Sequence, residues 1–299
     1  MTSNLLQNST PQHHAAVERF CSRQATIKTE MIAAVILVGM ALSPVERAVA
    51  YLSKEVPRWR GENGCFSCHN NGDGARALYL AGVARANPVL AETTEWLTNP
   101  GLWDSNKGNP AVSDKKLARI QFTTALLAAS GRKDAVCAAA GAIENDRGAD
   151  GSWSVDAGSP VTYGTVLATY YARQVLRACG RKTDLTDAWL AAVKPESVLD
   201  AAALLLASPG RADARALLIA AQTSNGGWGE YPGMPAQVFD TAIAVIALRG
   251  ETAAAKGRAW LVARQQEEGG WPETTRPPGS QSYAQHISTT AWALMALLD

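Results

Sequence analysis

The stretch Lys256–Trp271, KGRAWLVARQQEEGGW, sets the pattern on which the chain is built. Its first part is amphipathic and predicts the last turns of a helix. Gln265 and two glycines follow, and glycine adopts backbone angles that other residues resist, so a tight turn is expected. Trp271 can then fold back and cover the end of the helix.

Related stretches stand earlier in the chain. Ala216–Trp228, ALLIAAQTSNGGW, again has a leucine, three residues, a glutamine and then Gly-Gly-Trp after a short gap. Weaker copies are Gly148–Trp153, GADGSW, and Trp96–Trp103, WLTNPGLW. A repeated pattern of this kind predicts a repeated structural unit.

The pattern resembles the QW repeat of squalene–hopene cyclases and their relatives in the prenyltransferase/squalene-oxidase repeat superfamily. Every motif position is filled by Lys256, Gly257, Trp260, Leu261, Gln265, Gly269 and Trp271. The earlier copy is nearly complete, with Asp213 in place of a basic residue. The resemblance covers about residues 44–299 and implies an (α/α) toroid with an inner and an outer ring of helices.

Size and composition narrow the class of protein. The chain has 299 residues, of which 47% are hydrophobic and 18% charged, enough for one large domain or two small ones. Its net charge of +1 gives no reason to expect nucleic acid or an acidic partner. Period-2 alternation is almost absent while Ala and Leu dominate the apolar runs, so the fold class is all-α.

Residues 1–42 are interpreted as a disordered N-terminal segment that precedes the domain and contains a signal peptide. Met31–Leu42 is an uninterrupted apolar run, too short to cross a bilayer but long enough for the core of a signal peptide. Export, to the periplasm or elsewhere outside the cytoplasm, is therefore expected, with no transmembrane span in the mature chain. The alternative is a helix packed on the outside of the domain. Ser43–Glu46 forms a capping box that starts the domain, residues 43–299, and cleavage after Ala41 would preserve it.

About twelve helices come next, separated by glycine, proline and Asx/Ser turns. They are expected near 44–58, 74–86, 88–98, 113–130, 132–146, 160–179, 184–193, 196–207, 210–222, 236–249, 251–267 and 282–298. Two kinds of helix alternate along the chain. One kind carries charges on one face, and the other is apolar nearly all round. Six helix pairs would close a ring, which agrees with the (α/α)6 toroid of terpenoid cyclases and protein prenyltransferases that the resemblance implies.

A chemical motif lies between the first two predicted helices, in a loop over Glu62–Gly74. Cys65-Phe66-Ser67-Cys68-His69 is C-x-x-C-H, the attachment signature of c-type haem. Two thiols one helical turn apart reach two vinyl groups of one porphyrin, and His69 supplies the proximal iron ligand. Zinc held by Cys65, Cys68 and a histidine, a Cys65–Cys68 disulfide, or an accidental motif are the alternatives.

The other histidines, methionines and cysteines of the domain carry weaker signals. His286 begins the last predicted helix and is a candidate distal metal ligand, with Met234 as the second choice. The alternative for His286 is that it stands at the N-terminus of the helix and forms a hydrogen bond within its own turn. The alternative for Met234 is that it packs within its loop. Cys137 and Cys179 stand singly in apolar helical stretches and are expected to be small core residues.

The resemblance also suggests chemistry that this sequence does not support. Squalene–hopene cyclases carry a D-x-D-D-T-A run whose second Asp protonates the substrate. Asp240 and Thr241 match the end of that run here, but Phe239 stands at the position of the proton donor. The zinc ligands of protein prenyltransferases are also missing, with Thr289 in place of a histidine. The rim carboxylates, Asp73 among them, form no recognisable catalytic pair.

Three functions remain open. The first is an exported haem c protein that works in electron transfer or redox chemistry with a partner protein. The second is a terpenoid-cyclase-like enzyme with altered acid chemistry, and the third is a non-catalytic scaffold. In the last two, an apolar or isoprenoid ligand would occupy the toroid cavity, lined by rim aromatics. The sequence names no substrate, catalytic residue or oligomeric state.

Overall fold

A computed structural model describes residues 42–106, 114–155, 163–272 and 282–298. Residues Pro44–Asp299 form one compact unit, which holds all the helices described below. The predicted N-terminal segment and signal-peptide core lie outside the described residues, apart from Leu42.

Within the described ranges the chain forms twelve α-helices and no β-strand; a single isolated β-bridge joins Trp228 and Gln237. The predicted all-α class is confirmed. The α-helices are α2 (Pro44–Asn63), α3 (Ala75–Leu80), α4 (Pro88–Leu97), α5 (Lys115–Ala128), α6 (Lys133–Asn145), α7 (Thr165–Ala178), α8 (Asp184–Ala192), α9 (Val198–Ala207), α10 (Ala212–Ala221), α11 (Val238–Ala247), α12 (Thr252–Val262) and α13 (Tyr283–Leu297). A π-helical segment, η1 (Cys68–Gly74), precedes α3, and a 3-10 helix, η2 (Pro100–Ser105), follows α4.

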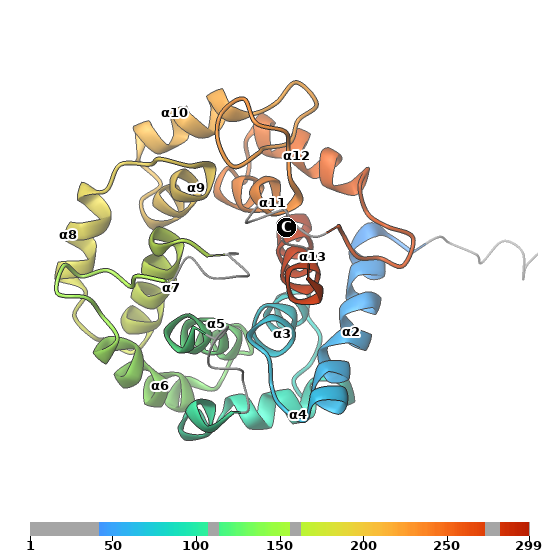
Figure 1. The fold of residues 1–299 in the computed structure, drawn as a ribbon, viewed down its shortest axis with the longest axis vertical. Helices are drawn as coiled ribbons and strands as arrows, with labels where there is room; N and C mark the ends of the chain where they lie inside the picture. Colours follow the sequence, from blue (N-terminus) through green and yellow to red (C-terminus); the bar gives the residue numbers. More distant parts are fainter. Residues whose placement is uncertain (1–41, 107–113, 156–162, 273–281, 299) are drawn as a thin grey trace, which may run out of the picture. The chain divides into compact units, whose positions relative to one another are not determined.

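The helices of this unit form two layers. In Figure 1 the odd-numbered helices α3 to α13 lie inside the even-numbered ones. Each odd-numbered helix packs on the next, and α13 packs on both α11 and α3, so their contacts make a closed circuit. The last helix of the chain thus lies beside the first inner one.

Burial explains the two layers. The inner helices α9, α11 and α13 bury nearly all of their side chains, which are mostly Ala, Leu, Ile and Val. The outer helices α10 and α12 bury a narrow stripe each and expose the rest. Helices packed on both sides need apolar residues all round, whereas surface helices need one apolar face.

The QW turns join outer helices to inner ones through buried tryptophans. Trp271 is fully buried, and its indole Nε1 donates to the carbonyl of Leu261 at 2.8 Å. Its backbone N–H donates to Thr290 Oγ1 on α13 at 3.0 Å. The same pair of bonds recurs at Trp228, with Leu218 and Thr241, and at Trp153, with Ile143 and Thr169. The predicted turn is therefore present three times.

Each turn also touches the next outer helix. Gly269 has φ +102°, and a Cβ atom there would lie 2.4 Å from the carbonyl oxygen of Arg47 on α2. Gly226 and Gly151 also have positive φ, and Cβ atoms there would meet the backbones of Lys256 on α12 and Leu185 on α8. Glycine is needed both for the backbone angle and for the close approach.

The fourth predicted copy, Trp96–Trp103, is different. Trp103 lies in η2, and its indole nitrogen is buried without a hydrogen-bond acceptor among the described residues. Its ring packs against Phe122 and Trp96 instead of closing a turn. Gly101, two residues before Trp103, does not have the positive φ of Gly151, Gly226 and Gly269, and the expectation of a fourth QW turn was wrong.

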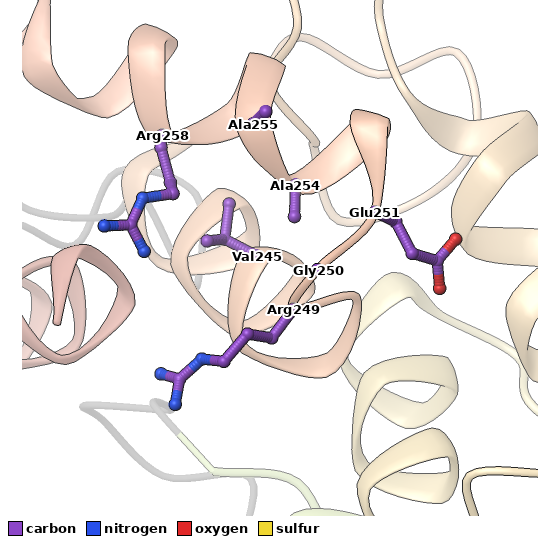
Figure 2. A pocket seen from close by; sticks show the side chains of 7 residues that line it. All are labelled: Val245, Arg249, Gly250, Glu251, Ala254, Ala255 and Arg258. Carbon is purple, nitrogen blue, oxygen red and sulfur yellow. The ribbon is translucent and has the colours of Figure 1, made fainter. Parts of the chain in front are cut away.

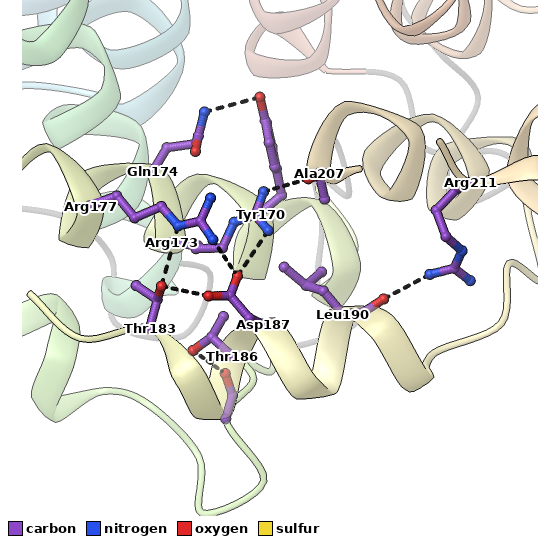
Figure 3. Close-up of polar contacts among 11 residues, drawn as sticks. Tyr170, Arg173, Gln174, Arg177, Thr183, Thr186, Asp187, Leu190, Ala207 and Arg211 are labelled. Carbon is purple, nitrogen blue, oxygen red and sulfur yellow. Dashed lines mark hydrogen bonds and ion pairs between the residues drawn. The ribbon is translucent and has the colours of Figure 1, made fainter. Parts of the chain in front are cut away.

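Arginine side chains donate hydrogen bonds to backbone carbonyls at the C-termini of helices (Figure 3). Asp187 on α8 accepts hydrogen bonds from Arg173, Arg177 and Thr183. Arg173 also donates to the carbonyl of Ala207, at the end of α9, at 2.9 Å. Cations at helix C-termini satisfy carbonyls that have no partner within the helix. This network therefore stabilises the α7–α9 region.

Candidate functional site

The C-x-x-C-H motif lies at the start of an inner helix, and its second half is not a loop. Ser67 has extended backbone angles, and its Oγ accepts hydrogen bonds from the backbone N–H groups of His69 and Asn70 at 3.1 and 3.0 Å. From Cys68 onward the chain is helical, first as η1 and then as α3. The predicted loop over Glu62–Gly74 is therefore confined to 64–67, because α2 extends to Asn63 and Ser67 caps the next helix.

Two asparagines fix this segment to the surrounding helices. Asn70 Nδ2 donates to the carbonyl of Glu55 and to the hydroxyl of Tyr283, both at 2.8 Å. Asn71 Nδ2 donates to Thr93 Oγ1 at 2.9 Å, and its Oδ1 accepts from the backbone N–H of Ser67. Both asparagines are fully buried. The residues directly after His69 are thus held by α2, α4 and α13.

The thiols and the imidazole of the motif are half-buried. Cys65 and Cys68 are both free, and Cys68 Sγ lies 3.5 Å from His69 Nδ1. Burial lowers the pKa of His69 to about 4, so its imidazole is neutral at pH 7 and can act as a ligand. Burial and the nearby Asp73 carboxylate raise the pKa of the Cys68 thiol to about 12.

This donor set fits haem c better than zinc. A porphyrin forms thioether bonds at its edge and binds a histidine at its centre, so two thiols and an imidazole need not meet at one point. A structural zinc ion needs four ligands around a single point, and the cysteines among them as thiolates. Among the described residues, no three His, Cys, Asp or Glu side chains converge to hold a metal ion.

The candidate distal ligands lie elsewhere. The ring of His286 on α13 stacks on Tyr51 of α2, with centroids 5.6 Å apart, and its Nε2 points towards Gly270 in the QW turn. Met234 is exposed in the loop between α10 and α11. A role for either side chain as an iron ligand stays a prediction.

Cys137 and Cys179 form a disulfide, with Cα atoms 5.4 Å apart. The expectation that they are separate core residues was wrong. They stand 42 residues apart, on α6 and at the end of α7, and come together because these two helices pack on each other. Disulfides persist mainly in oxidising compartments.

The carboxylate of Asp73, which the sequence analysis placed among those of the rim without a role, is buried in the interior. Asp73, in η1, has no exposed surface and accepts hydrogen bonds from Tyr163 Oη at 3.1 Å and Gln121 Nε2 at 3.0 Å, and also from Ser288 Oγ. Burial raises the pKa of Asp73 to about 6 despite these donors and the nearby Arg76. The only sequence signal was an acid between two glycines at the start of an apolar helix.

The position that corresponds to the cyclase acid is closed by packing. Phe239 is fully buried, and its ring meets Trp292 edge-on with centroids 5.6 Å apart. Asp240 is also fully buried, in the first turn of α11. Trp228 and Trp271 cap outer helices through their indole N–H groups, which confirms the expectation that they cover helix ends, and Trp153 does the same.

A surface pocket lies far from the motif in sequence, on α11 and α12 (Figure 2). Its volume is about 400 Å³, and it is lined by Val245, Arg249, Gly250, Glu251, Ala254, Ala255 and Arg258. Arg249 and Arg258 donate to backbone carbonyls at the end of α13. Two of the three charged side chains that line the pocket are therefore hydrogen-bonded to the C-terminal end of a helix.

No protein-family model matches this chain, and no curated protein matches it in sequence. None of the helices in the described ranges combines the length and apolar character needed to cross a membrane.

Proposed function

We propose that this chain is an exported c-type haem protein, in which Cys65 and Cys68 hold haem through thioether bonds and His69 is an axial ligand of its iron. Its activity would be electron transfer or redox chemistry with a partner protein. We further infer that Pro44–Asp299 is an (α/α)6 toroid of the terpenoid cyclase class. The closed circuit of inner helices and the three equivalent QW turns support that fold.

One contrast between the cysteines carries the functional proposal. Cys137 and Cys179 are joined, whereas Cys65 and Cys68 remain free and half-buried, three residues apart at the start of an inner helix. In an oxidising compartment, free thiols at this spacing are expected either to pair or to be bonded to something else. Attachment to haem explains both the spacing and the adjacent histidine.

The disulfide also supports export. It is independent of the apolar run Met31–Leu42, on which the prediction of a signal peptide rests. Haem attachment to C-x-x-C-H takes place outside the cytoplasm, so export is a condition of the proposal. Two separate features therefore favour the compartment that the proposal needs.

Bound haem would supply an iron centre that takes up and releases one electron. The chain's own residues would orient it. Ser67, Asn70 and Asn71 fix the backbone on both sides of Cys68 and His69. Phe66 is held by two hydrogen bonds between its backbone and the Asn106 side chain, and its ring stacks on Trp96 at 4.3 Å.

The proposal is tested by the absorption spectrum of protein expressed together with haem-maturation machinery. Wild-type protein should show a Soret band, and the double variant Cys65→Ser, Cys68→Ser should lose it. Cys137→Ala with Cys179→Ala is the matched control and should keep it. His69→Ala should shift the band by weakening the axial field of the iron. Wild-type protein that binds one zinc ion and no haem would refute the proposal.

The same spectra decide between the distal candidates. A shift in His286→Ala would place this side chain on the iron, although it would have to leave its stack on Tyr51. A shift in Met234→Ala alone would assign the sixth position to the exposed loop. The cyclase alternative gains no support, because a buried phenylalanine occupies the position of its acid.

A further inference from the structure

Two neighbouring side chains in the interior carry N–H donors without an acceptor among the described residues. They are Nε1 of Trp292, on α13, and Nη1 of Arg76, on α3. Trp292 is fully buried. An unsatisfied buried donor costs about 1–3 kcal/mol, so native proteins leave few of them. Two such donors on adjacent side chains point to an acceptor that the described residues do not supply.

The two donors belong to one aromatic cluster. The guanidinium carbon of Arg76 lies 4.3 Å from the ring centroid of Tyr171 and 5.4 Å from that of Trp292. Arg76 Nη2 donates to the Tyr171 hydroxyl at 2.8 Å, which fixes the plane of the guanidinium. Tyr163 and Phe239 pack against the other sides of Trp292. The two donors are thus held in place by the aromatic rings packed around them.

Among the described residues, Arg76 forms no ion pair. The Asp73 carboxylate interacts with its charge but takes its own hydrogen bonds from Tyr163, Gln121 and Ser288. An arginine stays charged at every physiological pH, and a buried charge is costly unless it is paired. Arg76 is half-buried, whereas its Nη1 and the Nε1 of Trp292 have almost no accessible surface, so a ligand can reach these two donors only when the surrounding side chains move.

We propose that Arg76 and Trp292 form a binding site for a small organic monocarboxylate. The carboxylate oxygens accept hydrogen bonds from Arg76 Nη1 and Trp292 Nε1, and the apolar part of the ligand lies against the ring of Tyr171. A carboxylate suits the planar guanidinium fork. Asp73, one helical turn before Arg76, disfavours a dianion such as phosphate. The site is independent of haem attachment at Cys65, Cys68 and His69.

Benzoate is a suitable probe, since it combines one carboxylate with one flat ring. Full-length protein labelled with ¹⁵N-tryptophan should show a saturable shift of the Trp292 indole resonance when benzoate is added. Benzamide, which has the same ring without the charge, should leave it unmoved at the same concentration. Inorganic phosphate should bind more weakly than benzoate. Trp292→Phe identifies the resonance and should weaken binding measured by calorimetry.

Arg76→Gln should weaken benzoate binding by about tenfold or more, because it removes a charge-assisted hydrogen bond. Trp260→Phe is the matched control, because Trp260 also lies against an arginine, Arg264, at 3.7 Å and has an indole N–H without an acceptor in the described chain. It lies on α12 and should leave binding unchanged. Circular dichroism checks that each variant is folded.

Absence of saturable benzoate binding would overturn the proposal, and would leave only water as the acceptor. Equal responses to benzoate and benzamide would overturn the role of Arg76. Phosphate that binds as tightly as benzoate would overturn the choice of an organic carboxylate.

Discussion

The side chain of Gln265 donates a hydrogen bond of 2.8 Å to the carbonyl of Pro44, which stands 221 residues earlier. The same Nε2 donates to Gly269 within its own turn at 2.9 Å, and Arg47 donates to the Oε1 of Gln265. Gln222 makes the equivalent pair of bonds, to Gly226 and to Ala253 on α12. The last QW turn therefore binds the first helix of the unit, α2, in the same way that the preceding QW turn binds its next outer helix, α12.

We expect Gln265→Ala to lower the free energy of unfolding by about 1–3 kcal/mol, because it leaves the two carbonyls without their donor. Urea unfolding curves measure this change. Gln266→Ala is the matched control, since Gln266 is exposed and adjacent. If both variants unfold at the wild-type urea concentration, the Gln265 bonds add nothing to stability.

Trp271 should matter more than Gln265. Trp271→Ala removes a fully buried ring and is expected to cost about 3–5 kcal/mol. Trp271→Phe keeps most of the ring but leaves the Leu261 carbonyl without its donor, at a cost of about 1–3 kcal/mol. Thermal midpoints compare the two variants. A Trp271→Ala protein as stable as wild type would mean that the tryptophan does not cap α12.

Asp73 should make stability depend on pH. Burial raises the pKa of Asp73 from its ordinary value of 3.8 to about 6 in the folded state. The folded protein therefore binds this proton more tightly, so stability is lost as pH rises from about 4 to about 7. The loss is up to about 3 kcal/mol at 1.36 kcal/mol per pKa unit. The side chain of the Asp73→Asn variant cannot titrate, so this variant should lack this pH-dependent loss of stability.

The measurement is the difference in unfolding free energy between wild type and Asp73→Asn across that pH range. Tyr163, Gln121, Ser288 and Arg76 face the carboxylate and are the same in both proteins. Parallel pH curves for the two proteins would show that Asp73 keeps an ordinary pKa.

The Cys137–Cys179 disulfide should stabilise the fold. It closes a loop over a sequence separation of 42, which corresponds to about 4 kcal/mol in the chain-entropy description. Cys137→Ala with Cys179→Ala should lose a stability of this order. Dithiothreitol should destabilise wild type by a similar amount and leave the variant unchanged. A wild-type protein that does not respond to the reductant would indicate that the bond is not formed.

Local signals account for what the sequence predicted well. Glycine and proline residues stand between the helices and predict all twelve of them, although several observed helix ends differ from the predicted ones. α2, for example, continues past Pro57 and ends at Asn63, where Gly64 has a positive φ. The QW turn was also predictable, since Gln265, Gly269 and Trp271 act within a few residues of one another.

Contacts between distant residues account for what the sequence did not predict. The partners of Asp73 stand 48, 90 and 215 residues away, so its burial had no local signal. The disulfide likewise depends on the packing of α6 on α7. The pairing of Arg76 with Trp292 joins the first and last inner helices, and only their contact brings these residues together.

The intact mass of the denatured protein tests the central claim most directly. After expression with haem-maturation machinery, the polypeptide should carry the added mass of one haem, because two thioether bonds survive denaturation. The double variant Cys65→Ser, Cys68→Ser should have the mass of the bare chain. A wild-type polypeptide without this added mass, with Cys65 and Cys68 recovered as free thiols or as a disulfide, would contradict the assignment of the motif to haem.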